Sequence, residues 1–180
     1  MIKTQSKSQN TSSDKAATVI EIFKPAIFKR DYEFRIDGKP VGYMKFAGHF
    51  HPKAEGKLFD EEWKLWQTGV WKPFLEYKAN QSPYDKGKFK LGWRCTVEWT
   101  SPAGKKYIFK KTKWWKSSWA WYDENNLPIV TFKDDHSFSK NQAQITIHNS
   151  SRKDLTLPIF LAWFMILKEK SHAASVAASS

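Results

Sequence analysis

Residues 155–167 form an apolar run, LTLPIFLAWFMIL, without a single charged side chain. As a helix, this run would span roughly 20 Å at about 1.5 Å per residue, which is shorter than the ~30 Å hydrocarbon core of a bilayer. Pro158 suits a first helical turn, where its missing N–H would have no partner anyway. A helix that is apolar all round must be covered on every side, so the run predicts a buried helix at about residues 156–168. A lipid-inserted anchor is the alternative for a run of this length.

The residues before this run have the pattern of short antiparallel strands. Residues 31–36 alternate apolar and polar side chains, and an Asp-Gly pair at 37–38 leads into a second such run, which predicts a hairpin. Two more hairpins are predicted at residues 94–111 and 118–132, and one further strand at 144–148. Residues 57–66 fit either a short helix or a strand. The pattern favours a mainly β sandwich or barrel that covers the terminal helix.

The chain length of 180 residues fits one ordinary domain. Residues 1–18 are polar and contain no apolar core of a secretory signal, so we expect a disordered tail there and another at 171–180. The net charge is +12, of which residues 1–18 carry +2 and residues 168–180 carry +1, so +9 belongs to the segment between them. This charge predicts attraction to polyanions such as nucleic acids, anionic lipids or acidic proteins.

Several segments together resemble a known family. They are DGKPVG at 37–42, KKYIFKKTKWWKSSWAWYDENNLPIVTF at 105–132, ITIHN at 145–149 and the apolar run at the end. In this order they resemble the tubby-like C-terminal superfamily, which includes tubby proteins, phospholipid scramblases and plant LURP-one-related proteins. The resemblance covers about residues 19–170. It implies a closed antiparallel β-barrel of about a dozen strands around a buried hydrophobic C-terminal α-helix.

The same resemblance implies a ligand class. Tubby proteins bind phosphoinositide headgroups through basic residues of the barrel, and scramblases are linked to an acidic calcium-binding stretch beside the terminal helix. The corresponding stretch here, residues 149–154, holds one acid and two bases. Because a calcium site needs several carboxylates, we do not expect calcium binding.

The strongest chemical feature is a stretch rich in lysine and tryptophan between residues 105 and 118, which contains no acid. Tryptophan beside several lysines suits an anionic membrane surface, where each lysine adds about 1 kcal/mol. The alternative is that the lysines coat the outside of a barrel and serve solubility only. The predicted lipid-binding residues are Lys105, Lys106, Lys110, Lys111, Lys113, Trp114, Trp115 and Lys116.

Patterns typical of enzymes and metal sites are weak in this chain. His49 and His51 share one face of a strand, but no residue is marked as a third ligand, so paired surface histidines are the favoured interpretation. Asp134-Asp135-His136 has no nucleophile motif beside it and predicts a turn. Cys95 is the sole cysteine, which excludes an internal disulfide and a two-cysteine zinc motif. No glycine-rich phosphate loop occurs. We therefore expect no enzyme activity and no cofactor or metal.

Nucleic acid is the less favoured polyanion. Arginine, which suits bidentate and stacking contacts, occurs at only four positions, and no RNA-recognition, KH or zinc-finger pattern is present. The sequence thus predicts a non-enzymatic cytoplasmic module, peripheral at the membrane, that binds phosphoinositide or phosphatidylserine headgroups. The alternative is a protein-interaction or structural scaffold domain whose charge serves solubility.

Overall fold

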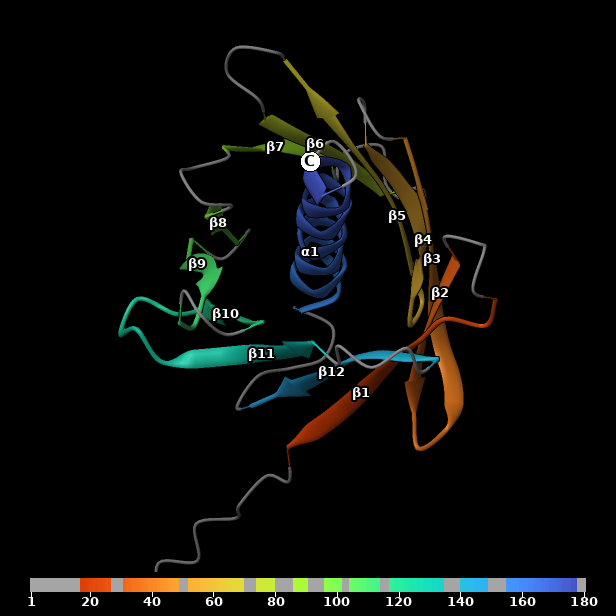
Figure 1. The fold of residues 1–180 in the computed structure, drawn as a ribbon. Coiled ribbons are helices and arrows are strands. Elements are labelled where there is room, and N and C mark those ends of the chain that lie inside the picture. Colours follow the sequence, from red (N-terminus) through yellow and green to blue (C-terminus); the bar gives the residue numbers. More distant parts are fainter. Residues whose placement is uncertain are drawn as a thin grey trace, which may run out of the picture.

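The computed structural model shows one antiparallel sheet and one long helix (Figure 1). It describes residues 17–26, 31–48, 52–69, 74–79, 86–90, 96–101, 104–113, 117–134, 140–148 and 155–177. The elements are β1 (Thr18–Phe23), β2 (Asp31–Ile36), β3 (Lys39–Ala47), β4 (Lys53–Leu58), β5 (Glu61–Thr68), β6 (Phe74–Ala79), β7 (Lys86–Lys90), β8 (Val97–Thr100), β9 (Lys106–Lys111), β10 (Ser118–Tyr122), β11 (Pro128–Asp134), β12 (Asn141–Ile147) and α1 (Thr156–Ala177). The predicted mainly β fold with a C-terminal helix is confirmed.

The strands pair in the order β7-β6-β5-β4-β3-β2-β1-β12-β11-β10-β9-β8, and each pairing is antiparallel. Consecutive strands are neighbours along both arms of this order, and β12 joins the arms by lying between β1 and β11. The sheet curls around α1, so that its edge strands β7 and β8 approach each other (Figure 1). Within the described residues, no ladder of hydrogen bonds joins β7 to β8.

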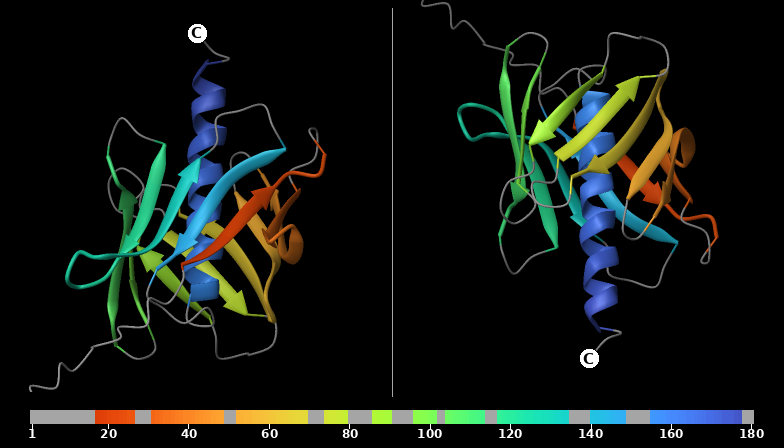
Figure 2. Two further views of the ribbon diagram at one scale, coloured as in Figure 1. Left: turned by 90° about the horizontal axis from the view of Figure 1, so that it is seen from below. Right: turned by 90° about the horizontal axis from the view of Figure 1, so that it is seen from above.

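This alternation of strand direction gives the curled sheet two distinct ends. Odd-numbered strands finish, and even-numbered strands begin, at the end where the helix leaves the sheet, which we call the exit end (Figure 2). Lys170 marks it, because its ammonium group contacts Asp134, the last residue of β11. The opposite, entry end is marked by Thr156, whose hydroxyl donates to Glu61 at the start of β5.

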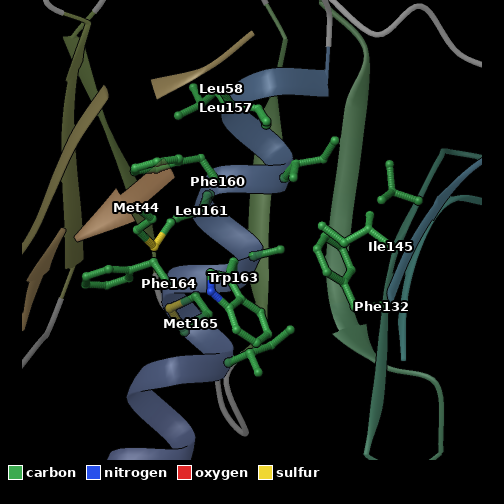
Figure 3. Packing of buried hydrophobic residues seen from close by; sticks show 14 of the residues in the cluster. Met44, Leu58, Phe132, Ile145, Leu157, Phe160, Leu161, Trp163, Phe164 and Met165 are labelled. Atoms are coloured by element: carbon green, nitrogen blue, oxygen red, sulfur yellow. The ribbon is translucent and has the colours of Figure 1, made fainter. Parts of the chain in front are cut away.

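The helix forms the centre of the hydrophobic core. Every residue from Leu155 to Leu167 is buried, and the helix turns its apolar side chains toward the sheet in all directions (Figure 3). Phe160 packs against Phe34, and Phe164 packs edge-on against Phe46. On another side, the indole N–H of Trp121 donates to the Pro158 carbonyl at 2.8 Å. The predicted burial of the terminal helix is confirmed, because the sheet supplies the cover that an all-apolar helix requires.

Two glycines on the inner face allow neighbouring strands to bend closely around the helix. A Cβ atom on Gly42 would lie 2.3 Å from the Lys57 carbonyl oxygen, and one on Gly56 would lie 2.0 Å from the Tyr43 carbonyl oxygen. Real Cβ atoms do not approach backbone this closely. Glycine at these inward positions of β3 and β4 is therefore required by the close approach of the two backbones.

The structure corrects the expected end of the helix. The sequence predicted a helix at about 156–168 followed by a disordered tail at 171–180, whereas α1 continues to Ala177. The additional residues include several alanines, the residue with the highest helix propensity, and they extend a helix that is already nucleated inside the sheet. The predicted tail at residues 1–18 lies outside the described residues up to residue 16, and Thr18 already belongs to β1.

The structure also resolves residues 57–66, which fitted either a helix or a strand. They belong to β4 and β5, joined by a tight turn in which Phe59 has φ 53°. In the predicted 31–46 hairpin, Asp37 and Gly38 both adopt positive φ, as the mirror-image turns of hairpins require. The later hairpins predicted around residues 101–104 and 123–126 are confirmed as β8–β9 and β10–β11.

Candidate functional site

The lysine-rich stretch singled out in the sequence falls on strand β9 and the residues on either side of it. Phe109 of β9 is fully buried and so identifies the face of the strand that points into the core. Because side chains alternate along a strand, Lys106, Ile108 and Lys110 point outward. Lys105 and Lys113 flank the strand and are exposed. Trp114, Trp115 and Lys116 lie outside the described residues.

Lys110 is the best-defined cation of the outer face. Its ammonium nitrogen lies 4.5 Å from the centroid of the Tyr122 ring and donates a hydrogen bond of 3.0 Å to Asn126 Oδ1. Both partners come from β10 and the turn after it, which β9 brings alongside by antiparallel pairing. The cation–π contact with the Tyr122 ring positions the Lys110 ammonium group at the surface of the sheet.

Lys111 lies on the opposite face of β9 from Lys110. It shares the inner face with Phe109, forms a salt bridge with Glu169 of α1, and lies 5.5 Å from the Trp119 ring centroid. Its charge is thus matched by a carboxylate where the helix leaves the sheet. Its ammonium group is thus engaged at the rim of the sheet and not on the outer face with Lys110, and its contact with lipid stays a prediction.

The structure spreads the remaining predicted lysines along the strand. Lys105 and Lys106 lie at the entry end, whereas Lys113 lies beyond β9 at the exit end. Lys106 and Lys110 are roughly 14 Å apart along an extended strand, and Lys105 and Lys113 roughly 27 Å. One phosphate group cannot contact all of them. The described lysines of this stretch therefore do not form a single compact site.

A second cluster of charge, which the sequence reasoning missed, surrounds α1 at the exit end. Lys170 contacts Asp134 at 2.6 Å, and the Asp134 side chain is only 2% exposed. The Lys170 ammonium also lies 5.6 Å from the centroid of the Trp163 ring. Together with the Lys111–Glu169 pair, this contact fixes two consecutive helix residues to β11 and β9. In the sequence, the only sign of this cluster is that Glu169 and Lys170 follow the apolar run. Their partners, Lys111 and Asp134, are distant in the chain.

Most of the other residues singled out in the sequence lie outside the described ranges. Within the described ranges, no three His, Cys, Asp or Glu side chains are grouped so that they could hold a metal ion. His49, His51, Cys95, Asp135 and His136 lie outside the described residues, so these predictions stay untested. Asp134 ends strand β11 and contacts Lys170, which differs from the turn predicted for residues 134–136.

The described part of the chain contains no helix with the length and hydropathy needed to cross a membrane. Comparison with protein-family models, curated proteins and solved structures found no match. The resemblance to the tubby-like superfamily therefore rests on the sequence segments alone and stays a prediction.

Proposed function

We propose that this protein is a non-enzymatic module that binds the anionic headgroups of membrane lipids, phosphoinositide or phosphatidylserine, as a peripheral protein of the cytoplasmic leaflet. The observation that carries the proposal is the net charge of +12, with exposed lysines spread over several elements, such as Lys53, Lys113 and Lys140. Multiple separated lysines suit an extended anionic surface better than one small ligand.

The exposed apolar side chains of the described surface favour membrane binding over a protein-scaffold function. Among the described residues, the large exposed apolar side chains lie on separate elements: Val19 on β1, Tyr43 on β3, Ile108 on β9, Leu127 in the turn before β11, and Val176 near the end of α1. A stable protein interface needs a contiguous apolar centre, which scattered residues do not provide. The scaffold function is nevertheless the outcome that a failed lipid test would favour.

Vesicle co-sedimentation tests the proposal. Purified protein is mixed at low salt with vesicles of phosphatidylcholine alone, of phosphatidylcholine with phosphatidylserine, and of phosphatidylcholine with a phosphoinositide. We expect binding to the anionic vesicles and little binding to the neutral ones, because lysines are attracted to the negative surface potential. Absence of binding to every vesicle would reject the lipid function.

We also propose that the sheet closes as a barrel along the β7–β8 junction. The two edge strands contact each other, and closure would remove the only free edges of the described sheet. Alternate backbone amides of a strand point toward its two neighbouring strands. The amides of β8 that point away from β9 would donate hydrogen bonds to β7 if the barrel is closed. Slow hydrogen exchange at these amides is expected, and exchange as fast as in a turn would contradict closure.

A further inference from the structure

The charged side chains at the two ends of the sheet differ in sign. We consider the described turns, the first and last residues of the strands whose side chains are described, and helix residues 168–170, which directly follow the buried part of α1. At the exit end, the Lys111–Glu169 and Lys170–Asp134 pairs cancel. Five lysines and one aspartate remain there, a net charge of +4: Lys24, Lys53, Lys113, Lys140, Lys168 and Asp31.

The entry end has the opposite balance. Three lysines and five acids occupy its turns and strand ends, a net charge of −2: Lys39, Lys105, Lys106, Asp37, Asp60, Glu61, Asp123 and Glu124. Two of the predicted lipid-binding lysines therefore lie among acids. Glu124 accepts a hydrogen bond from the Lys106 backbone amide at 3.0 Å, which holds this carboxylate close to the lysines.

The last turns of α1 project from the basic end. Figure 2 shows the helix extending past the strands at the exit end. The projecting residues 171–177 carry no acidic side chain, and they expose Ala173, Ala174 and Val176, the last of which is 57% exposed. A surface of small and apolar residues beyond a ring of lysines has the composition of a segment at a lipid–water interface.

A groove lies at the base of this projection. Its lining combines the apolar side chains of Tyr32, Phe46 and Leu167 with the cationic side chains of Lys24 and Lys170. The main chain fixes one part of the rim, because the Lys24 amide donates to the Lys140 carbonyl at 2.8 Å. Apolar and cationic groups thus face the same solvent region at the exit end.

We propose that the protein docks end-on against an anionic bilayer, with the exit end at the headgroups and the entry end pointing away. This inference rests on the proposed lipid function and assigns the surface that performs it. The exit lysines gain about 1 kcal/mol each when they reach the surface. The entry end lies a strand length away, at least roughly 15–20 Å, which exceeds the ~10 Å screening length in 0.1 M salt. The attraction to the bilayer therefore comes mainly from the charges of the exit end.

Two triple variants with the same loss of charge test the orientation. Lys24/Lys53/Lys140→Gln changes the exit end, and Lys39/Lys105/Lys106→Gln changes the entry end. Both variants lose three positive charges and so have the same net charge. After circular dichroism shows that both are folded, their binding to phosphatidylserine-containing vesicles is measured by co-sedimentation. We expect the affinity of the exit variant for the vesicles to fall at least about tenfold below that of wild type. The affinity of the entry variant should stay within about threefold of wild type.

A pair of single variants probes the projecting helix. Val176→Asp places a carboxylate on the projection, and Leu127→Asp makes the same change at an exposed position of the entry end. The first is expected to weaken vesicle binding and the second to leave it nearly unchanged. Equal effects within both pairs, or larger effects of the entry variants, would overturn the end-on orientation while leaving lipid binding intact. Failure of wild type to bind would overturn both proposals.

Discussion

At the scale of single residues, two ion pairs that look alike differ in the exposure of their carboxylates. The Asp134 side chain is 2% exposed beside Lys170, whereas the Glu169 side chain is 30% exposed beside Lys111. Removing the cation from the first pair leaves a carboxylate that is shielded from water. Removing it from the second leaves a carboxylate whose Oε2 atom is buried but whose side chain is 30% exposed. Burial of the remaining charge should therefore decide the energetic consequence.

The same substitution in both pairs tests this difference. Lys170→Met should lower the free energy of unfolding by about 2 kcal/mol, a value already reduced because Lys170 itself is part-exposed. Lys111→Met should lower it by less than about 1 kcal/mol, since exposed pairs contribute little. Urea unfolding followed by tryptophan fluorescence measures both. Equal losses would show that the burial of Asp134 does not matter.

Strand alternation is the sequence signal that separates the lysines of β9 into two faces. Phe109 is an evident core residue, and Lys111, two positions further on, must share its face. In a run of charge considered without this alternation, Lys111 looks the same as Lys110. The partner of Lys111 could not have been found in this way, since Glu169 is brought to it only by the path of the helix through the sheet.

At the scale of the element, α1 stabilises the fold by packing rather than by amphipathicity. Leu161 is fully buried inside the curled sheet, whereas Val176 projects beyond it. Leu161→Ala should therefore lower the free energy of unfolding by about 2–5 kcal/mol, because it leaves a cavity in a core that cannot fully collapse. Val176→Ala, at an exposed position, should change it by less than about 0.5 kcal/mol. Thermal and urea unfolding compare them, and similar values would contradict the central position of the helix.

The bend between β3 and β4 makes a second prediction at this scale. Gly56→Ala forces a Cβ atom against the Tyr43 carbonyl oxygen, so the strands must separate. The control is Gly38→Ala, at a turn with φ 74° and open space around the new Cβ, where only backbone strain of about 1 kcal/mol is expected. We expect the melting temperature to fall further for Gly56→Ala. A smaller fall than for Gly38→Ala would contradict the close approach of the strands.

The elements differ in how far the sequence could predict them. The β2–β3 hairpin was predictable because Asp37-Gly38 is a turn pair suited to positive φ at both positions. The β4–β5 turn was not, because its positive-φ residue is Phe59, which carries no such signal. The helix core was predictable from its uniform apolar run. Its extension to Ala177 was missed because the polar serines and His172 outweighed the alanines in the reading of the tail.

At the scale of the whole molecule, the sheet and the helix depend on each other. The inner face of the described sheet is lined by large apolar side chains that share one core with those of α1. Deletion of residues 155–180 should therefore abolish the folded state and yield an aggregated or unfolded chain. Deletion of residues 173–180, which starts beyond the buried part of the helix, should leave the fold intact. Near-ultraviolet circular dichroism distinguishes the two, and a folded product of the longer deletion would contradict the fold described here.

The charge distribution of the whole molecule could be predicted only in its total. The net charge of +12 is a property of the sequence. The separation of +4 at the exit end from −2 at the entry end, counted over the described turns and strand ends, depends on the strand order. Lys105 and Lys113 are close in the sequence and lie at opposite ends of β9. Lys24 and Lys140 are distant in the sequence and adjacent at the exit end.

The central claim is that a folded protein whose helix stays inside the sheet binds an anionic membrane by its surface charge. Flotation with phosphatidylserine-containing vesicles, followed by a wash at high salt, tests it most directly. We predict that the protein floats with the vesicles at low salt and is released by the wash, because salt screens attraction between exposed charges. Absence of flotation at low salt, or protein that resists the wash as an inserted helix would, contradicts the claim.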